Sequence, residues 1–112
     1  MQSTLIRPNI IKIQPQGHVN ASNAPEFQRQ LTTAISSTQD SIVLVDMAQV
    51  ESLDSAGLMA LVSALRMAHN LNRRFSLCSV SPSLRIIFEL TQLDKVFEIF
   101  ENKTTFEAAS DL

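Results

Sequence analysis

Short apolar runs alternate along the chain with segments in which apolar residues recur every three or four positions. The runs are rich in branched aliphatic side chains and occupy residues 5–16 (with a break near 8–9), 41–47, 74–80 and 96–100. Runs of this length predict β-strands, and Gly17 predicts a turn or bulge that is followed by a brief extension at His18-Val19. The run 41–47 has four consecutive aliphatic residues, which is typical of a central strand buried on both faces.

Four helices are predicted from helical spacing and from start signals: after Asn23, from Ala56 to about residue 70, after Ser81 and after Thr104. The first and last of these starts resemble capping boxes, because an acidic residue follows three positions later, at Glu26 and Glu107. The segment 51–55, just ahead of the second helix, is polar and is predicted to be a loop.

Strands that alternate with helices predict an α/β fold whose sheet is at least partly parallel. The 112 residues contain no repeat, linker or low-complexity stretch, so we expect one domain spanning residues 1–112. Sites in such folds usually lie at the carboxyl edge of the sheet. The strand that ends near Asp46 and the helix that begins near Ser55 are expected to meet at that edge.

Composition and charge disfavour several classes of function. The net charge is −2, the basic residues are scattered, and there is no Trp or Tyr, so neither a basic stripe nor a stacking surface for nucleic acid is expected. Cys78 is the single cysteine, and no cysteine–histidine cluster or Walker-type loop is present, so no metal and no cofactor are expected. Without a signal peptide or a membrane-length apolar window, we expect a cytoplasmic protein with no direct membrane contact.

Residues 50–58 carry the candidate chemistry. Ser55 stands where the second helix begins, and its hydroxyl can cap the free N–H groups of the first turn, which is the ordinary structural interpretation. A phosphate on Ser55 would be stabilised in the same place, because helix N-termini attract anions. The predicted helix after Ser55 has an apolar core stripe made of Leu58, Leu61, Val62 and Leu65. The small Ala56 and Gly57 would let a kinase come close, and three residues off that stripe are expected to form an exposed docking face: Met59, Ala60 and Ser63.

The sequence Asp54-Ser55-Ala56-Gly57-Leu58 after the Ile-Val-Leu-Val-Asp strand resembles the motif of STAS domains, specifically those of bacterial anti-sigma-factor antagonists. Residues 17–26 are similar to the Gly-x-x-Asp loop of that family and the helix after it, and residues 79–82 to the segment ahead of its third helix. The resemblance covers nearly the whole chain. It implies an STAS-type α/β domain with a mixed central sheet of four to five strands and helices packed mainly on one face.

In that family, the serine after the motif aspartate is phosphorylated by an anti-sigma factor that is also an ATP-dependent serine kinase. The unphosphorylated antagonist holds the anti-sigma factor and frees a sigma factor, and a serine phosphatase resets the system. The resemblance implies that this chain is a binding module and not an enzyme, a monomer or weak homodimer, with Ser55 as its phosphoacceptor. It places Asn20 in a docking loop and Asp54 beside the phosphoacceptor. Together with the helix residues named above, the expected partner-binding residues are Asn20, Ala21, Ser22, Asp54, Ala56, Gly57, Met59, Ala60 and Ser63.

Two details qualify this comparison. The family often has an acidic residue at the position of Asn20, a change that bears on the choice of partner. Asp54 would orient the Ser55 hydroxyl or approach the Mg²⁺ of the kinase.

Two other functions are alternatives. The same fold can serve as an accessory subunit of an ABC transporter, docked on its ATPase, although that role does not need a modifiable serine. A hydrolase triad that joins Ser55 with Asp46 and either His18 or His69 is disfavoured, because Ser55 lacks the Gly-x-Ser-x-Gly elbow.

Overall fold

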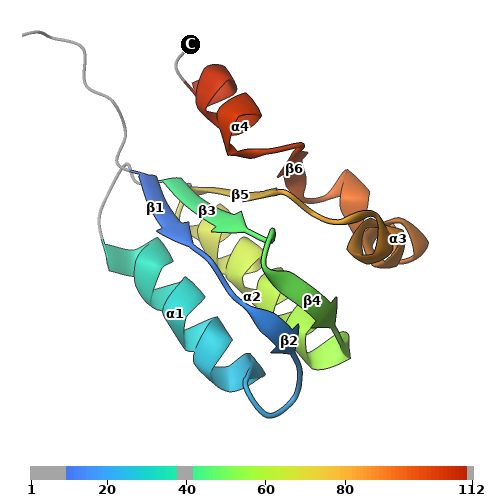
Figure 1. Ribbon diagram of the computed structural model, residues 1–112. Helices are drawn as coiled ribbons and strands as arrows, with labels where there is room; N and C mark the ends of the chain where they lie inside the picture. Colours follow the sequence, from blue (N-terminus) through green and yellow to red (C-terminus); the bar gives the residue numbers. More distant parts are fainter. Residues whose placement is uncertain (1–9, 38–41, 111–112) are drawn as a thin grey trace, which may run out of the picture.

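The chain folds into a layered α/β structure, shown in Figure 1. The computed structural model describes residues 10–37 and 42–110. Its elements in chain order are β1 (Ile10–Ile13), β2 (Gly17–Val19), α1 (Ala24–Ser37), β3 (Ile42–Asp46), β4 (Val50–Leu53), α2 (Ser55–Asn70), β5 (Arg74–Cys78), α3 (Pro82–Leu90), the 3₁₀ turn η1 (Leu93–Lys95), β6 (Glu98–Phe100) and α4 (Lys103–Ser110).

Four strands form the main sheet in the order β1-β3-β5-β6, and β2 and β4 form a separate two-stranded ribbon. All strand pairings in residues 10–37 and 42–110 are parallel, because helices return the chain to the starting edge between paired strands. The expected α/β class and four-stranded sheet are therefore confirmed, while the sheet is parallel, not mixed, in this part of the chain. The predicted start of the first strand, residues 5–9, lies outside the described residues.

The β2–β4 ribbon continues beyond the carboxyl ends of β1 and β3, as Figure 1 shows. The register shifts between Gly17 and His18, where Gly17 has φ +70°, so the predicted bulge at this glycine is confirmed. The polar segment after Val50 was wrongly predicted to be a loop. It forms β4, because Val50 and Leu53 are buried at its two ends while the residues between them face solvent.

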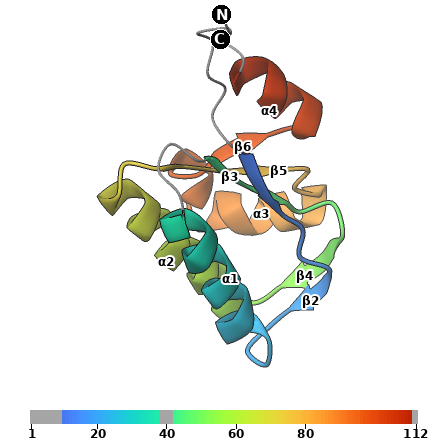
Figure 2. The same ribbon diagram turned by 90° about the vertical axis from the view of Figure 1, so that its left-hand side faces the viewer.

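Helices cover the two faces of the sheet unequally (Figure 2). Helices α1, α2 and α3 pack on one face around a large aliphatic core that includes the fully buried Leu31, Val43 and Leu61. Among the helices of the described residues, only α4 packs on the other face, where Phe106 covers a small cluster made of Ile42, Leu44 and Cys78. The expectation that helices lie mainly on one face is confirmed.

The short α4 is held by an aromatic and ionic contact at the sheet edge. The Arg74 guanidinium lies 5.7 Å from the ring centre of Phe100 and 5.4 Å from that of Phe106. Its Nε donates to Glu98 Oε1 at 2.7 Å, and the buried Ser76 hydroxyl donates to the same carboxylate. Burial would raise the pKa of Glu98, but the hydrogen bonds from Arg74 and Ser76 outweigh it and hold that pKa below its usual value.

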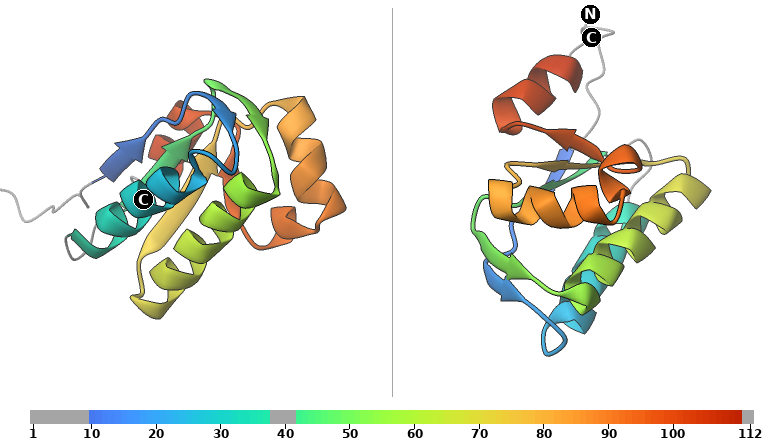
Figure 3. Two further views of the ribbon diagram at one scale, coloured as in Figure 1. Left: turned by 90° about the horizontal axis from the view of Figure 1, so that it is seen from below. Right: turned by 90° about the vertical axis from the view of Figure 1, so that its right-hand side faces the viewer.

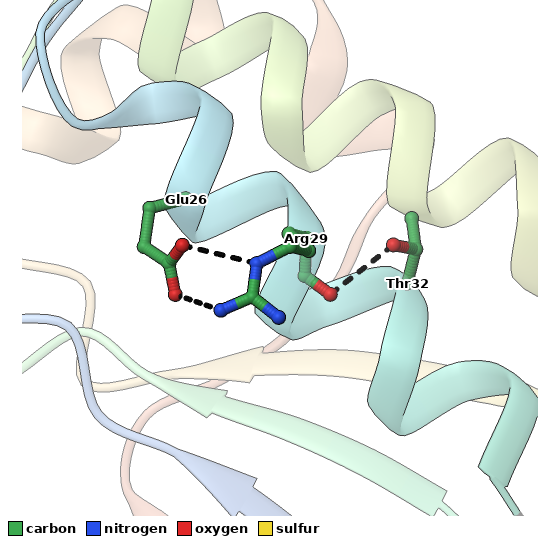
Figure 4. Close-up of polar contacts among 3 residues, drawn as sticks. All are labelled: Glu26, Arg29 and Thr32. Carbon is green, nitrogen blue, oxygen red and sulfur yellow. Dashed lines mark hydrogen bonds and ion pairs between the residues drawn. The ribbon is translucent and has the colours of Figure 1, made fainter.

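Two predicted capping boxes take a different form. In α1, the Glu26 carboxylate pairs with Arg29, at 3.0 Å to Nε and 2.5 Å to a terminal nitrogen, and this hydrogen bond lowers the pKa of Glu26 (Figure 4). In α4, the cap is Asn102, whose Oδ1 accepts the Thr105 N–H at 2.8 Å, instead of Thr104. The predicted cap of α3 is confirmed, because the Ser81 side chain accepts from the Leu84 N–H.

Candidate functional site

Helix α2 starts at the far end of the β2–β4 ribbon, and its N-cap is Asp54. Asp54 has extended backbone (φ −93°, ψ −174°), and its Oδ1 accepts the Gly57 N–H at 3.0 Å. The interpretation of Ser55 as the cap is therefore wrong by one residue. A carboxylate is the better acceptor for the free N–H groups of the first turn, because its negative charge also complements the helix dipole.

Ser55 is the first residue of α2 and is exposed. No group in the described part of the chain hydrogen-bonds its hydroxyl. The N–H groups of Ser55 and Ala56 have no intrahelical acceptor, as expected for the first turn of a helix. Asp54 thus satisfies part of this helix end, and the Ser55 hydroxyl and the N–H groups of Ser55 and Ala56 have no hydrogen-bond partner among the described residues.

The loop between β2 and α1 lies against this helix start, which the left view of Figure 3 shows from below. The Ala21 N–H donates to Asp54 Oδ2 at 3.2 Å, so the same carboxylate that caps α2 also fixes the loop. Inside the loop, Asn20 Oδ1 accepts both the N–H and the hydroxyl of Ser22, at 3.0 Å and 2.6 Å. Of the predicted docking residues, Asn20, Ala21, Ser22 and Asp54 therefore form one surface beside Ser55.

Two residues predicted to touch a partner are buried. Ala60 is 1% exposed, and Gly57 faces inward, where an added Cβ would lie 2.7 Å from Leu53 Cδ1 and 2.8 Å from Val19 Cγ1. The small size of Gly57 serves the packing of α2 on the ribbon and gives a partner no access. Of the other α2 residues predicted to contact a partner, Met59 is 55% exposed, and Ser63 and Ala56 are half-buried.

A polar group that the sequence interpretation missed lies on the ribbon. His18 Nδ1 and Ser52 Oγ are 2.6 Å apart, and His18 Nε2 lies 4.0 Å from Glu51 Oε1. These residues meet because His18 and Ser52 are partners in the parallel register. The sequence could have predicted that His18 and Ser52 are neighbours only if β4 had been recognised as a strand.

The structure does not assemble the hydrolase triad. His18 is bonded to Ser52 and not to Ser55, His69 lies in the last turn of α2, and Asp46 accepts from Gln14 and from the Ala48 N–H. Within residues 10–37 and 42–110, no three His, Cys, Asp or Glu side chains gather in a way that could hold a metal ion. Among the same residues, none of the helices has the length and apolar character needed to cross a membrane.

Comparison with known proteins supports one family. A model of the STAS domain matches residues 2–105. BtrV of Bordetella bronchiseptica, which is named as an anti-sigma factor antagonist, is 24% identical over 94 residues, covering 84% of this chain and 80% of BtrV.

Solved structures agree in fold. An anti-sigma factor antagonist from Thermotoga maritima has a TM-score of 0.84 at 20% identity, over 92% of this chain and 88% of that chain. The phosphorylated form of SpoIIAA, a cell fate determinant of Bacillus, has a TM-score of 0.69 at 16% identity, over 96% of this chain and 97% of that chain. Because the family model spans almost its whole length, this chain belongs to the STAS domain family, among relatives that are named as anti-sigma factor antagonists.

Proposed function

We propose that this protein is an anti-sigma-factor antagonist whose binding to an anti-sigma factor is switched by phosphorylation of Ser55. The partner is itself an ATP-dependent serine kinase, and a serine phosphatase reverses the modification. One observation carries the proposal: Ser55 is exposed at the start of α2, and the fold does not use its hydroxyl, because Asp54 supplies the cap. The hydroxyl is therefore available to a kinase at no cost to the helix.

The helix start suits a phosphate as well as a hydroxyl. The unused N–H groups of Ser55 and Ala56 can donate hydrogen bonds to an anion, and the helix dipole favours negative charge there. Phosphorylation adds about two negative charges beside Asp54 and Glu51. The fold tolerates this charge, whereas a partner surface fitted to the uncharged serine does not. The switch therefore acts on binding and not on folding.

In the proposed phosphoryl transfer, the main contribution of this chain is to position the Ser55 hydroxyl. Ser55 Oγ attacks the γ-phosphorus of ATP held by the anti-sigma factor, the bond from that phosphorus to the β–γ bridging oxygen breaks, ADP leaves, and the hydroxyl proton passes to the kinase. Asp54 uses both carboxylate oxygens to bind backbone N–H groups, of Gly57 and Ala21. This arrangement favours a role for Asp54 in holding the helix start over a role in contacting Mg²⁺.

The neighbouring serines are poorer acceptors. The Ser52 hydroxyl already contacts His18 Nδ1 at 2.6 Å, and it projects from a strand with no helix end beside it. Ser63 is half-buried and lies two turns into α2, beyond the reach of the first-turn N–H groups. We therefore expect a single phosphate per chain, on Ser55.

The test is capture of the partner from a lysate of the native organism, identification by mass spectrometry, and incubation of the purified pair with Mg-ATP. We expect one phosphate on wild type and on the Ser63→Ala control, and none on Ser55→Ala. Ser55→Ala should keep its affinity for the partner in titration calorimetry, and Ser55→Asp should lose it. Capture of a transporter ATPase in place of a kinase would favour the ABC-transporter role, and label on Ser52 or Ser63 would refute the site.

A further inference from the structure

A hollow of about 270 Å³ lies between the C-terminal half of α2 and the residue that follows η1, and it is lined by Val62, Leu65, Arg66, His69, Asn70 and Val96. We propose that this hollow, with the adjoining face of α2, binds an acidic amphipathic helix of the anti-sigma factor. The identity of the partner rests on the proposed function. The chemistry of the segment that the hollow binds does not depend on it.

The hollow is continuous with the Ser55 surface along one face of α2. Residues spaced by three or four positions share a helix face, and the series Ser55, Met59, Val62, Arg66 and His69 follows that spacing from one end of α2 to the other. Over these residues a helix rises by about 21 Å, which is the reach of a partner helix of about four turns. A segment that contacts Met59 near Ser55 can therefore also fill the hollow.

The apolar part of this face is unusually open. Met59 is 55% exposed, and Val96, which lines the hollow together with the partly buried Val62, is 53% exposed. Large apolar side chains that remain exposed as a group, with polar residues at the rim, mark surfaces for other proteins. Apolar anchors of a partner helix, spaced three or four residues apart, would cover these three side chains.

The charged residues of α2 indicate which kind of partner segment would bind. The chain contains eleven acidic residues, yet α2 contains none, and its ionisable side chains are Arg66 and His69 at the rim of the hollow. Both are exposed, and neither has an acidic partner in the described part of the chain. Just before the other end of α2, Glu51 on β4 and the N-cap residue Asp54 are acidic. A bound helix therefore fits best with its acidic residues beside Arg66 and its apolar residues over Val62 and Val96.

The test uses the unphosphorylated, ¹⁵N-labelled full chain and a synthetic amphipathic helical peptide with leucines at i, i+4 and i+7 flanked by glutamates. Two control peptides replace every glutamate by lysine, or every leucine by serine. We expect amide shifts to cluster around Val62, Arg66 and Val96 with the acidic peptide, and binding to weaken at least about tenfold with either control peptide.

Variants of this chain complete the test. Arg66→Glu and Val96→Ser should each weaken binding of the acidic peptide by about tenfold or more. The matched controls, Lys12→Glu on β1 and Leu90→Ser on α3, change exposed residues outside the hollow and should bind like wild type. Melting temperatures of all four variants verify the fold.

Equal binding of the lysine peptide, or shifts that map away from the hollow, would overturn the proposal. Binding of the acidic peptide in the hollow, combined with failure to find a kinase that modifies Ser55, would leave this inference standing and reject the proposed function.

Discussion

Replacing Gly57 with alanine tests how tightly α2 packs on the β2–β4 ribbon. The added Cβ would lie 2.7 Å from Leu53 Cδ1, 2.8 Å from Val19 Cγ1 and 3.0 Å from the Val19 carbonyl oxygen. The two side-chain atoms can turn away, but the carbonyl oxygen accepts the Asp54 N–H at 3.1 Å and belongs to the ribbon backbone. Either the ribbon or the start of α2 must therefore move.

Two opposing effects set the magnitude of the change. Alanine is favoured over glycine in a helix interior by up to about 1 kcal/mol, and by less in the first turn. Overpacking a well-filled core typically costs about 1–3 kcal/mol. Because the closest contacts include backbone, we expect the second effect to win and the free energy of unfolding to fall by about 1–2 kcal/mol. For a domain of this size the melting temperature should fall by roughly 4–10 °C.

Urea unfolding followed by circular dichroism measures this change, and faster hydrogen exchange of the Asp54 amide would show whether the ribbon contact opens. The matched control is Ala56→Gly, which changes helix propensity in the same turn without adding an atom. Its loss should be less than about 1 kcal/mol. A Gly57→Ala protein as stable as wild type would show that the contacts with Val19 and Leu53 relax freely, and the packing argument would fail.

Three further outcomes follow from the same structure. Asp54→Ala should lower the free energy of unfolding by about 0.5–2 kcal/mol in urea titrations. Asp54→Asn should lower it by much less, because the asparagine side-chain oxygen can still accept the Gly57 N–H, whereas alanine cannot; equal losses would contradict the capping role. The pKa of Glu98 is lowered in the folded state, so its stabilisation is present above the unfolded pKa and is lost as pH falls through the folded one. Glu98→Gln should therefore lose less stability than wild type as pH falls from about 7 to below the unfolded glutamate pKa of about 4.3. Burial raises the pKa of the Cys78 thiol, and the side chain lies under Phe106. Ellman's reagent should therefore react slowly with Cys78 until urea unfolds the protein. A rapid reaction with the native protein would show that α4 opens easily.

Most of the fold could be predicted from the sequence because its signals are local. The aliphatic run that became β3 is buried at every position, and Leu58, Leu61 and Leu65 of the predicted α2 stripe are buried, whereas Val62 of that stripe is only half-buried. The strand β4 could not be recognised in the same way. It is short, both of its central residues are polar and exposed, and its existence depends on pairing with β2, which is more than thirty residues away in sequence.

The start of α2 was predicted in position, but its contacts were not. The order of Asp54 and Ser55 at a helix start was visible, whereas the choice of cap depends on which residue adopts extended backbone, and this is set by the bond from the Asp54 N–H to Val19 on the ribbon. The burial of Ala60 was missed for a related reason. Its helix face meets core residues that the sequence does not show to be neighbours, so spacing alone suggested an exposed residue.

Two adjacent residues have different roles in the proposed switch: Asp54 holds the start of α2, and Ser55 is the proposed phosphoacceptor. Asp54 joins α2 to the loop 20–23 through bonds to the Gly57 and Ala21 N–H groups, so it carries the structural role. Ser55 makes no side-chain hydrogen bond within the described residues, so its modification removes no structural contact. If the serine were the cap, a phosphate would replace a bond on which the helix depends, and the two states would differ in stability as well as in charge. With the cap on Asp54, the proposed phosphorylation would change the charge of the surface proposed for the partner and would leave the cap in place.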